Sequence, residues 1–316
     1  MTIYERIVGG ITGVAIGDAL GVPVEFKTRR ELYDDPVMDM IGYGTYNQPP
    51  GTWSDDTSLT LCLAESLSEA GYNPDDIAKR FVKWYREGYM TPYGEVFDIG
   101  GTTRQAILRL EECVDPVHAG PADERSNGNG SLMRILPAAM YFSESDESDM
   151  VKAVCSISCI THGHPRSQLA CVFYCLLVKE LLKGEDPMGA YGNAIDLLPD
   201  LAQCFNLAGE LPHFSRILTG MLEGLTENDV NSGGYVVSTL EASLWCLLKG
   251  TNFSETVLKA VNLGGDSDTT GAVAGGLAGI YYGLGSVPRK WLDMLARTED
   301  IMALSKKFAA VVLKYR

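Results

Sequence analysis

Several patterns that define common protein classes are missing from this 316-residue sequence. It has no C-x-x-C and no H-E-x-x-H motif, and only four histidines, so a zinc site has little support. Segments in which polar and apolar residues alternate are nearly absent, which argues against a β-sheet. Lysine and arginine number 26 against 41 acidic residues, and the net charge of −15 disfavours nucleic acid and anionic membranes as partners.

Features of membrane and secreted proteins are also missing. No apolar run approaches the roughly 18 to 20 residues that a membrane-spanning helix needs. The apolar stretch from Ile7 to Leu20 is rich in glycine and contains Asp18, and it lacks the basic region and cleavage site of a signal peptide. No repeat, low-complexity tract or linker divides the chain, so we expect one domain over residues 1–316.

The eight cysteines do not form the pattern of a disulfide framework. Most of them fall in helical segments, namely Cys62, Cys155, Cys159, Cys171, Cys175, Cys204 and Cys246. A buried thiol behaves as a small apolar side chain, and reduced core thiols are typical of cytoplasmic proteins. We therefore expect free, buried cysteines and a cytoplasmic location.

Helical periodicity dominates what the chain does contain. Apolar residues recur three and four positions apart after Ser54-Asp55-Asp56 and again after Asn73-Pro74. Similar patterns predict helices over residues 149–160, 165–183 and 235–249, after Pro288 and up to about Leu313, with Thr102 and Ser254 as the caps of two more. The prediction is an all-α domain of about a dozen helices.

Two acidic motifs stand at predicted helix starts. Gly264-Gly265-Asp266-Ser267-Asp268-Thr269 precedes a helix of small residues, and Thr52-Trp53-Ser54-Asp55-Asp56-Thr57 precedes an amphipathic one. Alone, each motif reads as an acidic helix cap, which the helix dipole favours. Together they offer four carboxylates and several hydroxyls, enough for two divalent cations that prefer oxygen ligands.

A glycine-rich turn is a candidate for binding phosphate. Ser126-Asn127-Gly128-Asn129-Gly130-Ser131 leads into Leu132-Met133-Arg134, which we expect to begin a helix. Backbone N–H groups at such a turn can bind a diphosphate without adding a positive side chain. The alternative is an ordinary Asn-Gly loop.

These motifs, in this order, strongly resemble the ADP-ribosylglycohydrolase family. The resemblance spans residues 9 to about 283 and rests on five segments: 17–26 (GDALGVPVEF), 51–57 (GTWSDDT), 128–134 (GNGSLMR), 161–165 (THGHP) and 264–269 (GGDSDT). Any one segment is weakly specific, but five in order are highly specific. The resemblance implies an all-α fold with a binuclear Mg or Mn centre.

The resemblance also implies a set of metal ligands. One ion would take Ser54, Asp55, Asp56 and Asp268, and the other Asp266, Asp268 and Thr269, with Asp268 bridging. Many family members carry threonine where this chain has Ser54, so the hydroxyl is kept. A calcium-stabilised helical protein without nucleotide affinity is an alternative explanation of the same acids.

Further residues match family positions that act on the substrate. Glu25 corresponds to a mobile glutamate beside the metals, and Asp98 to the catalytic aspartate of the dinitrogenase reductase-activating branch. Asp98 lies between Phe97 and Ile99, so we expect a raised pKa and a role as general base or in opening the ribose ring. Without the motif, Glu25 would read as a surface residue.

The substrate-binding residues implied by the resemblance are Gly100, Asn129, Gly130, Ser131, Met133 and His162. We expect His162 to contact the distal ribose or a phosphate, and His164 to be structural rather than half of a zinc pair. Asp18 is expected to brace the first helix near the site. Tyr93, Phe97 and Tyr235 are candidates for stacking against adenine.

The resemblance implies metal-dependent hydrolysis of the bond between ADP-ribose C1″ and a modified protein side chain, with ADP-ribose as product. Asp98 favours arginine as the modified side chain. Hydrolysis of serine-linked or other O-linked ADP-ribose is the alternative within the same class. A non-catalytic ADP-ribose-binding protein, like the related lens crystallins, is the alternative from another class.

Overall fold

The computed structural model describes residues 1–314. Within them there is no β-strand, only an isolated bridge between Gly128 and Tyr235, so the all-α prediction is confirmed. The α-helices are α1 Ile3–Gly21, α2 Arg29–Asp34, α3 Asp55–Glu69, α4 Pro74–Glu87, α5 Gly101–Glu111, α6 Pro116–Ala119, α7 Leu136–Tyr141, α8 Glu147–Cys159, α9 Pro165–Lys183, α10 Pro187–Cys204, α11 Ser215–Leu218, α12 Val236–Lys249, α13 Phe253–Asn262, α14 Ser267–Tyr282, α15 Arg289–Met294 and α16 Thr298–Val312. The 3-10 segments are η1 Val22–Val24, η2 Ala208–Phe214, η3 Leu222–Gly224, η4 Glu227–Asp229 and η5 Leu284–Ser286.

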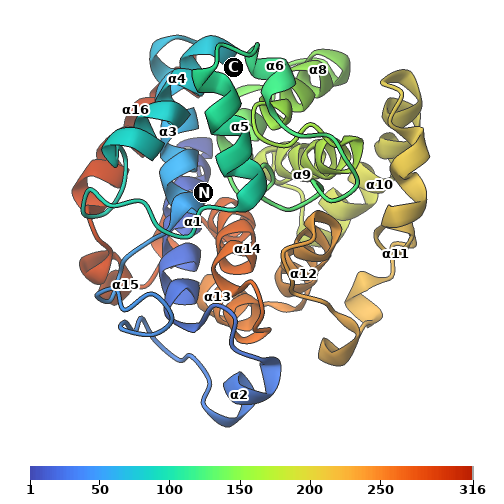
Figure 1. The fold of residues 1–316 in the computed structure, drawn as a ribbon. Coiled ribbons are helices and arrows are strands. Elements are labelled where there is room, and N and C mark those ends of the chain that lie inside the picture. Colours follow the sequence, from blue (N-terminus) through green and yellow to red (C-terminus); the bar gives the residue numbers. More distant parts are fainter. Residues whose placement is uncertain (315–316) are drawn as a thin grey trace.

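Helices α1 and α14 lie side by side at the centre of the molecule, with the other helices around them (Figure 1). Glycines recur every four residues along both contact faces, at 9, 13, 17 and 21 and at 271, 275 and 279. A Cβ atom at Gly13 would lie 2.1 Å from the carbonyl oxygen of Gly275, and one at Gly17 1.9 Å from that of Gly271. The two backbones can approach this closely only because these residues have no side chain.

This contact carries the functional motifs to one place. A Cβ at Gly21, the last residue of α1, would lie 2.3 Å from the Cα atom of Asp268. The start of α14 is therefore packed against the end of α1 and the η1 segment that precedes Glu25.

The segment Ile3–Val24, which comprises α1 and η1, is long and apolar enough by composition to cross a membrane. The sequence-based expectation that no stretch approaches this limit is therefore wrong. Every residue of its apolar window is buried inside the molecule. Its composition fits a central helix that other helices cover on all sides.

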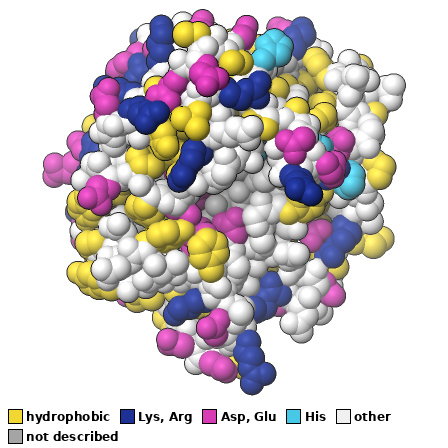
Figure 2. All heavy atoms as spheres, in the orientation of Figure 1, with side chains coloured by type: hydrophobic (Ala, Val, Ile, Leu, Met, Phe, Trp, Pro, Cys, Tyr) yellow, Lys and Arg dark blue, Asp and Glu magenta, His cyan; other side chains and the backbone are white. Residues whose placement is uncertain are grey.

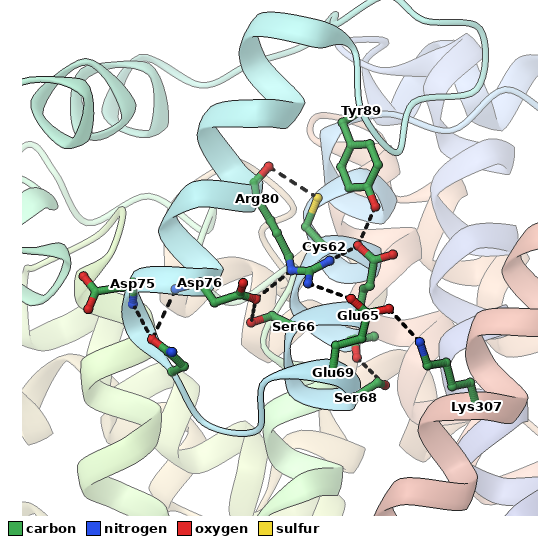
Figure 3. A network of polar contacts seen from close by, with 12 residues as sticks. Cys62, Glu65, Ser66, Ser68, Glu69, Asp75, Asp76, Arg80, Tyr89 and Lys307 are labelled. Carbon is green, nitrogen blue, oxygen red and sulfur yellow. Dashed lines mark hydrogen bonds and ion pairs between the residues drawn. The ribbon is translucent and has the colours of Figure 1, made fainter.

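A network around Arg80 ties α3 to α4 and α16 (Figure 3). The guanidinium of Arg80 pairs with Asp76 at 2.7 Å, with Glu69 at 2.9 Å and with Glu65. Glu69 also accepts from Lys307 of α16 at 2.6 Å, and Glu65 accepts from the Tyr89 hydroxyl at 2.6 Å. One cation thus holds three carboxylates from two helices.

Several helix bounds agree with the periodicity and others do not. Helix α9 runs from Pro165 to Lys183 as predicted, and Gly184 ends it with a φ of 102°. Helix α5 is not capped by Thr102, because it begins at Gly101 with Gly100 as N-cap. Helix α13 is capped by Asn252 rather than Ser254, since the Asn252 side chain accepts from the backbone of Glu255. Helix α10 was not predicted, because two glycines and Pro199 interrupt its pattern.

All eight cysteines are free, as expected. Cys62, Cys171, Cys175 and Cys246 are buried, and Cys155 and Cys159 are partly buried. Cys113 and Cys204 are exposed, so the expectation of a buried thiol is wrong at these two positions. Cys204 is the last residue of α10, which lies at the edge of the molecule (Figure 1).

Candidate active site

A cavity of about 550 Å³ opens between the starts of α3, α5 and α14. In Figure 2, acidic side chains are visible deep in a hollow at the centre of the face that is drawn. The predicted site residues on its wall are Glu25, Asp55, Asp98, Gly100, Asn129, Gly130, Met133, His162, Asp266 and Thr269. Arg104 is the one lysine or arginine on this wall within the described residues. The remaining predicted residues, Ser54, Asp56, Ser131 and Asp268, are buried behind it.

The two acidic motifs meet across the cavity floor. Asp55 and Asp56 form the first turn of α3, and Asp266 is the N-cap residue of α14. The Thr269 hydroxyl donates to Asp56 Oδ1 at 3.3 Å and so connects positions 213 residues apart in the chain. The structure therefore brings the predicted ligands together.

The oxygen atoms of this floor fit divalent cations. Asp18, Asp56 and Asp268 each offer an oxygen within 4.8 Å of the others, and Glu25, Asp98 and Asp268 do the same. One buried oxygen each of Glu25, Asp56 and Asp268 has no hydrogen-bond partner. Burial, reinforced by neighbouring carboxylates, raises the pKa of Asp56 and Asp268 well above the usual range. Cations would satisfy these open oxygens and offset the repulsion.

Asp18 differs from the other acids because its oxygens are already engaged. They accept from the backbone of Ser54 at 2.9 and 3.0 Å, and from the Thr57 hydroxyl at 2.6 Å. Burial nevertheless raises the pKa of Asp18 to about 7. Asp18 therefore holds the first turn of α3 against α1, in line with the expected bracing role.

The remaining predicted ligands have distinct surroundings. Ser54 caps α3, and its hydroxyl accepts from the backbone of Asp56 at 3.3 Å. Asp55 and Asp266 line the cavity but belong to neither group of three carboxylates. Asn129 Nδ2 donates to Asp266 Oδ2 at 2.8 Å. The division of these ligands between two ions stays a prediction.

Asp98 is held in an unusual backbone conformation. Its φ is 58°, in the left-handed region that residues other than glycine seldom adopt. The Tyr46 hydroxyl donates to Asp98 Oδ1, and the Tyr46 ring packs on Phe97 with centroids 5.1 Å apart. Burial raises the pKa of Asp98, as its apolar neighbours predicted. Sequence reasoning missed Tyr46, because it lies in a loop without any periodic signal.

Glu25 is buried at the cavity wall, directly after η1. Burial, together with the charge of Asp98, raises the pKa of Glu25 to about 8. Its neighbour Phe26 has a φ of 65° and leaves 67% of its surface exposed at the cavity mouth. Glu25 is therefore not the ordinary surface residue that its sequence context alone suggested.

The Asn-Gly turn lines the cavity. The expectation that it leads directly into a helix is wrong. Residues 130–134 form turns, and helix α7 starts only at Leu136. The turn is held by Asn129, whose backbone N–H donates to the Gly234 carbonyl at 3.1 Å and whose side chain donates to Thr239 at 2.9 Å. The Ser131 hydroxyl accepts from Ser158 at 2.9 Å, away from the cavity wall.

The two histidines play different structural parts. Burial and the charge of Arg134 lower the pKa of His162 to about 3, so its ring is neutral near pH 7. His164 caps α9, and its Nδ1 accepts from the backbone of Arg166 at 3.1 Å, in agreement with a structural role. Of the three aromatic candidates for adenine, only Phe97 lies on the cavity wall within the described residues.

Comparison with known proteins identifies the family. The ADP-ribosylglycohydrolase family model matches residues 1–315. ADP-ribosylarginine hydrolase Tri1 of Serratia proteamaculans (strain 568) is 33% identical over 314 residues, which cover 96% of this chain and 78% of that protein. The ADP-ribosyl-dinitrogen reductase glycohydrolase of Rhodospirillum rubrum is 31% identical over 297 residues, covering 93% and 91%.

A solved structure agrees with this result. The structure described as an ADP-ribosylglycohydrolase-related protein complex has a TM-score of 0.82 and 35% identity, and the match covers 98% of this chain and 99% of that one. The chain therefore belongs to the ADP-ribosylglycohydrolase family. Membership supports hydrolysis of an ADP-ribosyl bond as the class of reaction.

Proposed function

We propose that this protein is a metal-dependent hydrolase that releases ADP-ribose from modified arginine side chains of proteins. The observation that carries the proposal is Asp268, whose buried carboxylate lies beside those of Asp56, Glu25 and Asp98 and keeps one oxygen without a hydrogen-bond partner, at one end of a ligand-sized cavity. The Serratia relative is named for ADP-ribosylarginine, which supports arginine as the acceptor.

Two Mg or Mn ions would be held by Ser54, Asp55, Asp56, Asp266, Asp268 and Thr269. When bound, such ions orient substrate hydroxyls and stabilise negative charge on oxygen. Asp18 would not serve as an open ligand, because its oxygens already accept from the start of α3.

Hydrolysis of the C1″–N bond needs a proton taken from water and a proton given to the leaving nitrogen. Asp98 suits the first task, because the Tyr46 hydroxyl donates to it and favours its ionised form. Glu25 suits the second, because its Oε2 has no hydrogen-bond partner and burial favours its protonated form. The turn at Asn129 and Gly130 would hold the diphosphate, and Arg104 would offset its charge.

The test is hydrolysis of arginine-, serine- and glutamate-linked ADP-ribose in Mg or Mn, with free ADP-ribose as readout and EDTA as control. We expect release from the arginine substrate only. Release from serine alone would favour the O-linked alternative. Binding of ADP-ribose without any turnover by metal-loaded protein would instead favour a non-catalytic binding protein.

A further inference from the structure

Arg134 is a fully buried cation without an acidic partner. Within residues 1–314 it forms no ion pair, and its guanidinium stacks over the Phe81 ring at 4.7 Å. Its Nη2 donates to the Ile157 carbonyl at 3.1 Å and to the Thr161 hydroxyl at 2.7 Å, while Nε and Nη1 have no partner. Burial lowers the pKa of Arg134 to about 10, so the side chain stays charged at neutral pH. Burying an unpaired charge costs folding free energy, so a functional role for Arg134 would account for its presence.

Arg134, Thr161 and His162 form a chain of hydrogen bonds in which the direction of donation can be assigned. A guanidinium can only donate, so the Thr161 oxygen accepts from it. The single proton of the Thr161 hydroxyl is then available for His162 Nδ1, which lies 2.9 Å away. No other acceptor for that proton is present among the described residues. The arrangement that gives the Thr161 proton a partner makes Nδ1 of His162 the unprotonated nitrogen of a neutral ring.

The other ring nitrogen of His162 lies next to the phosphate-binding candidate turn. A Cβ atom at Gly130 would lie 3.2 Å from His162 Nε2, and one at Gly128 3.7 Å from it. His162 lines the cavity, and Nε2 has no hydrogen-bond partner in the described part of the chain. The side of the ring that carries Nε2 is thus the side that a ligand can meet.

We propose that Arg134 and Thr161 are positioning residues that fix His162 as its Nε2–H tautomer, so that the ring donates a hydrogen bond to an oxygen of the substrate. The part that concerns the substrate rests on the proposed function. The opposite tautomer would turn a lone pair toward that oxygen and repel it. In a cavity with this many carboxylates, a neutral donor can bind a phosphate or ribose oxygen without forming an ion pair with the acids.

The test is long-range ¹H–¹⁵N correlation NMR on protein labelled with ¹⁵N-histidine, at pH 7.5 and without ligand. His162→Asn identifies the signals of His162. His164 is an internal reference, because the backbone of Arg166 holds its Nδ1 as an acceptor. We expect an Nε2–H pattern for His162 in the wild type and in Thr161→Ser, which keeps the hydroxyl. Thr161→Val should shift His162 toward the Nδ1–H form and leave His164 unchanged.

Ligand binding gives a second readout, measured by calorimetry with ADP-ribose. We expect the Kd of Thr161→Val to rise about tenfold, the size of one hydrogen bond between neutral groups, and that of Thr161→Ser to stay near wild type. A wild-type Nδ1–H signal would overturn the assignment even if Thr161→Val fails to fold. An Nε2–H signal without any ADP-ribose binding would support the tautomer and count against the proposed function instead.

Discussion

Asp268 is the residue on which the two groups of carboxylates depend. It is fully buried, and its Oδ2 has no hydrogen-bond partner. Its backbone position is set by α14, whereas Glu25 and Asp98 come from loops. Loss of its charge should therefore remove cation binding without disturbing the helices.

Asp268→Asn tests this. We expect loss of calorimetric Mn binding and a fall in turnover of at least about 100-fold, with an unchanged helical circular dichroism spectrum. Asp149→Asn, which changes an exposed residue, is the control and should keep both Mn binding and turnover. Unfolding of Asp268→Asn would mean that the carboxylate is mainly structural.

Tyr46 is the residue that we expect to matter most among those without a sequence signal. Tyr46→Phe removes the hydroxyl that donates to Asp98, so kcat should fall about tenfold while KM changes little. Tyr43→Phe is a matched control, because Tyr43 is in the same loop and 66% exposed. Equal kcat values for the two variants would exclude a role for Tyr46 in holding Asp98.

Some residues of the site can be predicted from the sequence and others cannot. Asp266 and Asp268 could be predicted, because the start of a helix has a local sequence pattern of glycine, acidic and hydroxyl residues. Tyr46 was not, because its partner Asp98 is 52 residues away and no period relates the two. The Arg134 and Thr161 contact is hidden in the same way, since nothing local in the sequence says that a guanidinium is buried.

Among the contacts between helices, Arg80 of α4 pairs with two carboxylates of α3, Glu65 and Glu69, and also with Asp76 of its own helix (Figure 3). Arg80→Met should lower the free energy of unfolding by about 2 kcal/mol, because it leaves partly buried acids without a cation. Urea unfolding measures the change. Arg86→Met is the control, since Arg86 pairs with Glu111 on the surface and should contribute less than about 1 kcal/mol. Equal losses would show that the network adds nothing beyond a surface pair.

The contact between α1 and α14 predicts a second stability difference. Gly17→Ala places a methyl group against the Gly271 carbonyl, so we expect a loss of about 3 kcal/mol and weaker Mn binding at the displaced Asp268. Gly192→Ala is the control in α10, where a Cβ would meet nothing within 4 Å. It should be neutral or raise stability by up to about 1 kcal/mol. Chemical denaturation of both variants compares them, and similar stabilities would contradict close packing.

Element boundaries were predictable where the chain marks them. Pro165 and Gly184 bracket α9 in the sequence as in the structure. Helix α10 escaped prediction, because Gly189, Gly192 and Pro199 weaken its pattern while neighbouring helices supply the packing that stabilises it. Periodicity indicates which face of a helix is apolar, but not which helix packs against that face. The pairing of α1 with α14 could therefore not be predicted from the glycines of either helix.

For the whole molecule, the buried acids link stability to pH. Burial raises the pKa of Asp18 to about 7 and that of Glu25 to about 8, against about 4 for such groups in the unfolded chain. A raised folded pKa contributes stability that is complete below the unfolded pKa and is lost as pH rises through the folded one. The metal-free protein should therefore lose stability between about pH 5 and pH 8.

Cations should reverse this loss, because they favour ionised carboxylates. Thermal unfolding in EDTA and in Mn at pH 5.5 and pH 8 measures the effect. We expect the increase in Tm caused by Mn to be larger at pH 8, where 100-fold excess over Kd corresponds to about 2.7 kcal/mol. An increase independent of pH would mean that Mn acts away from the buried acids.

The pairing of α1 with α14 has a consequence for how the protein is made. Helix α1 is synthesised well before α14, the helix of residues 267–282 that covers its glycine face. Until then the glycine face of α1 is uncovered, although α3 and α7 can already pack against other parts of the helix, and the acids of α3 lack those of α14. The glycine face of α1 therefore stays uncovered until α14 has been made, and the acids of the site cannot meet before that point.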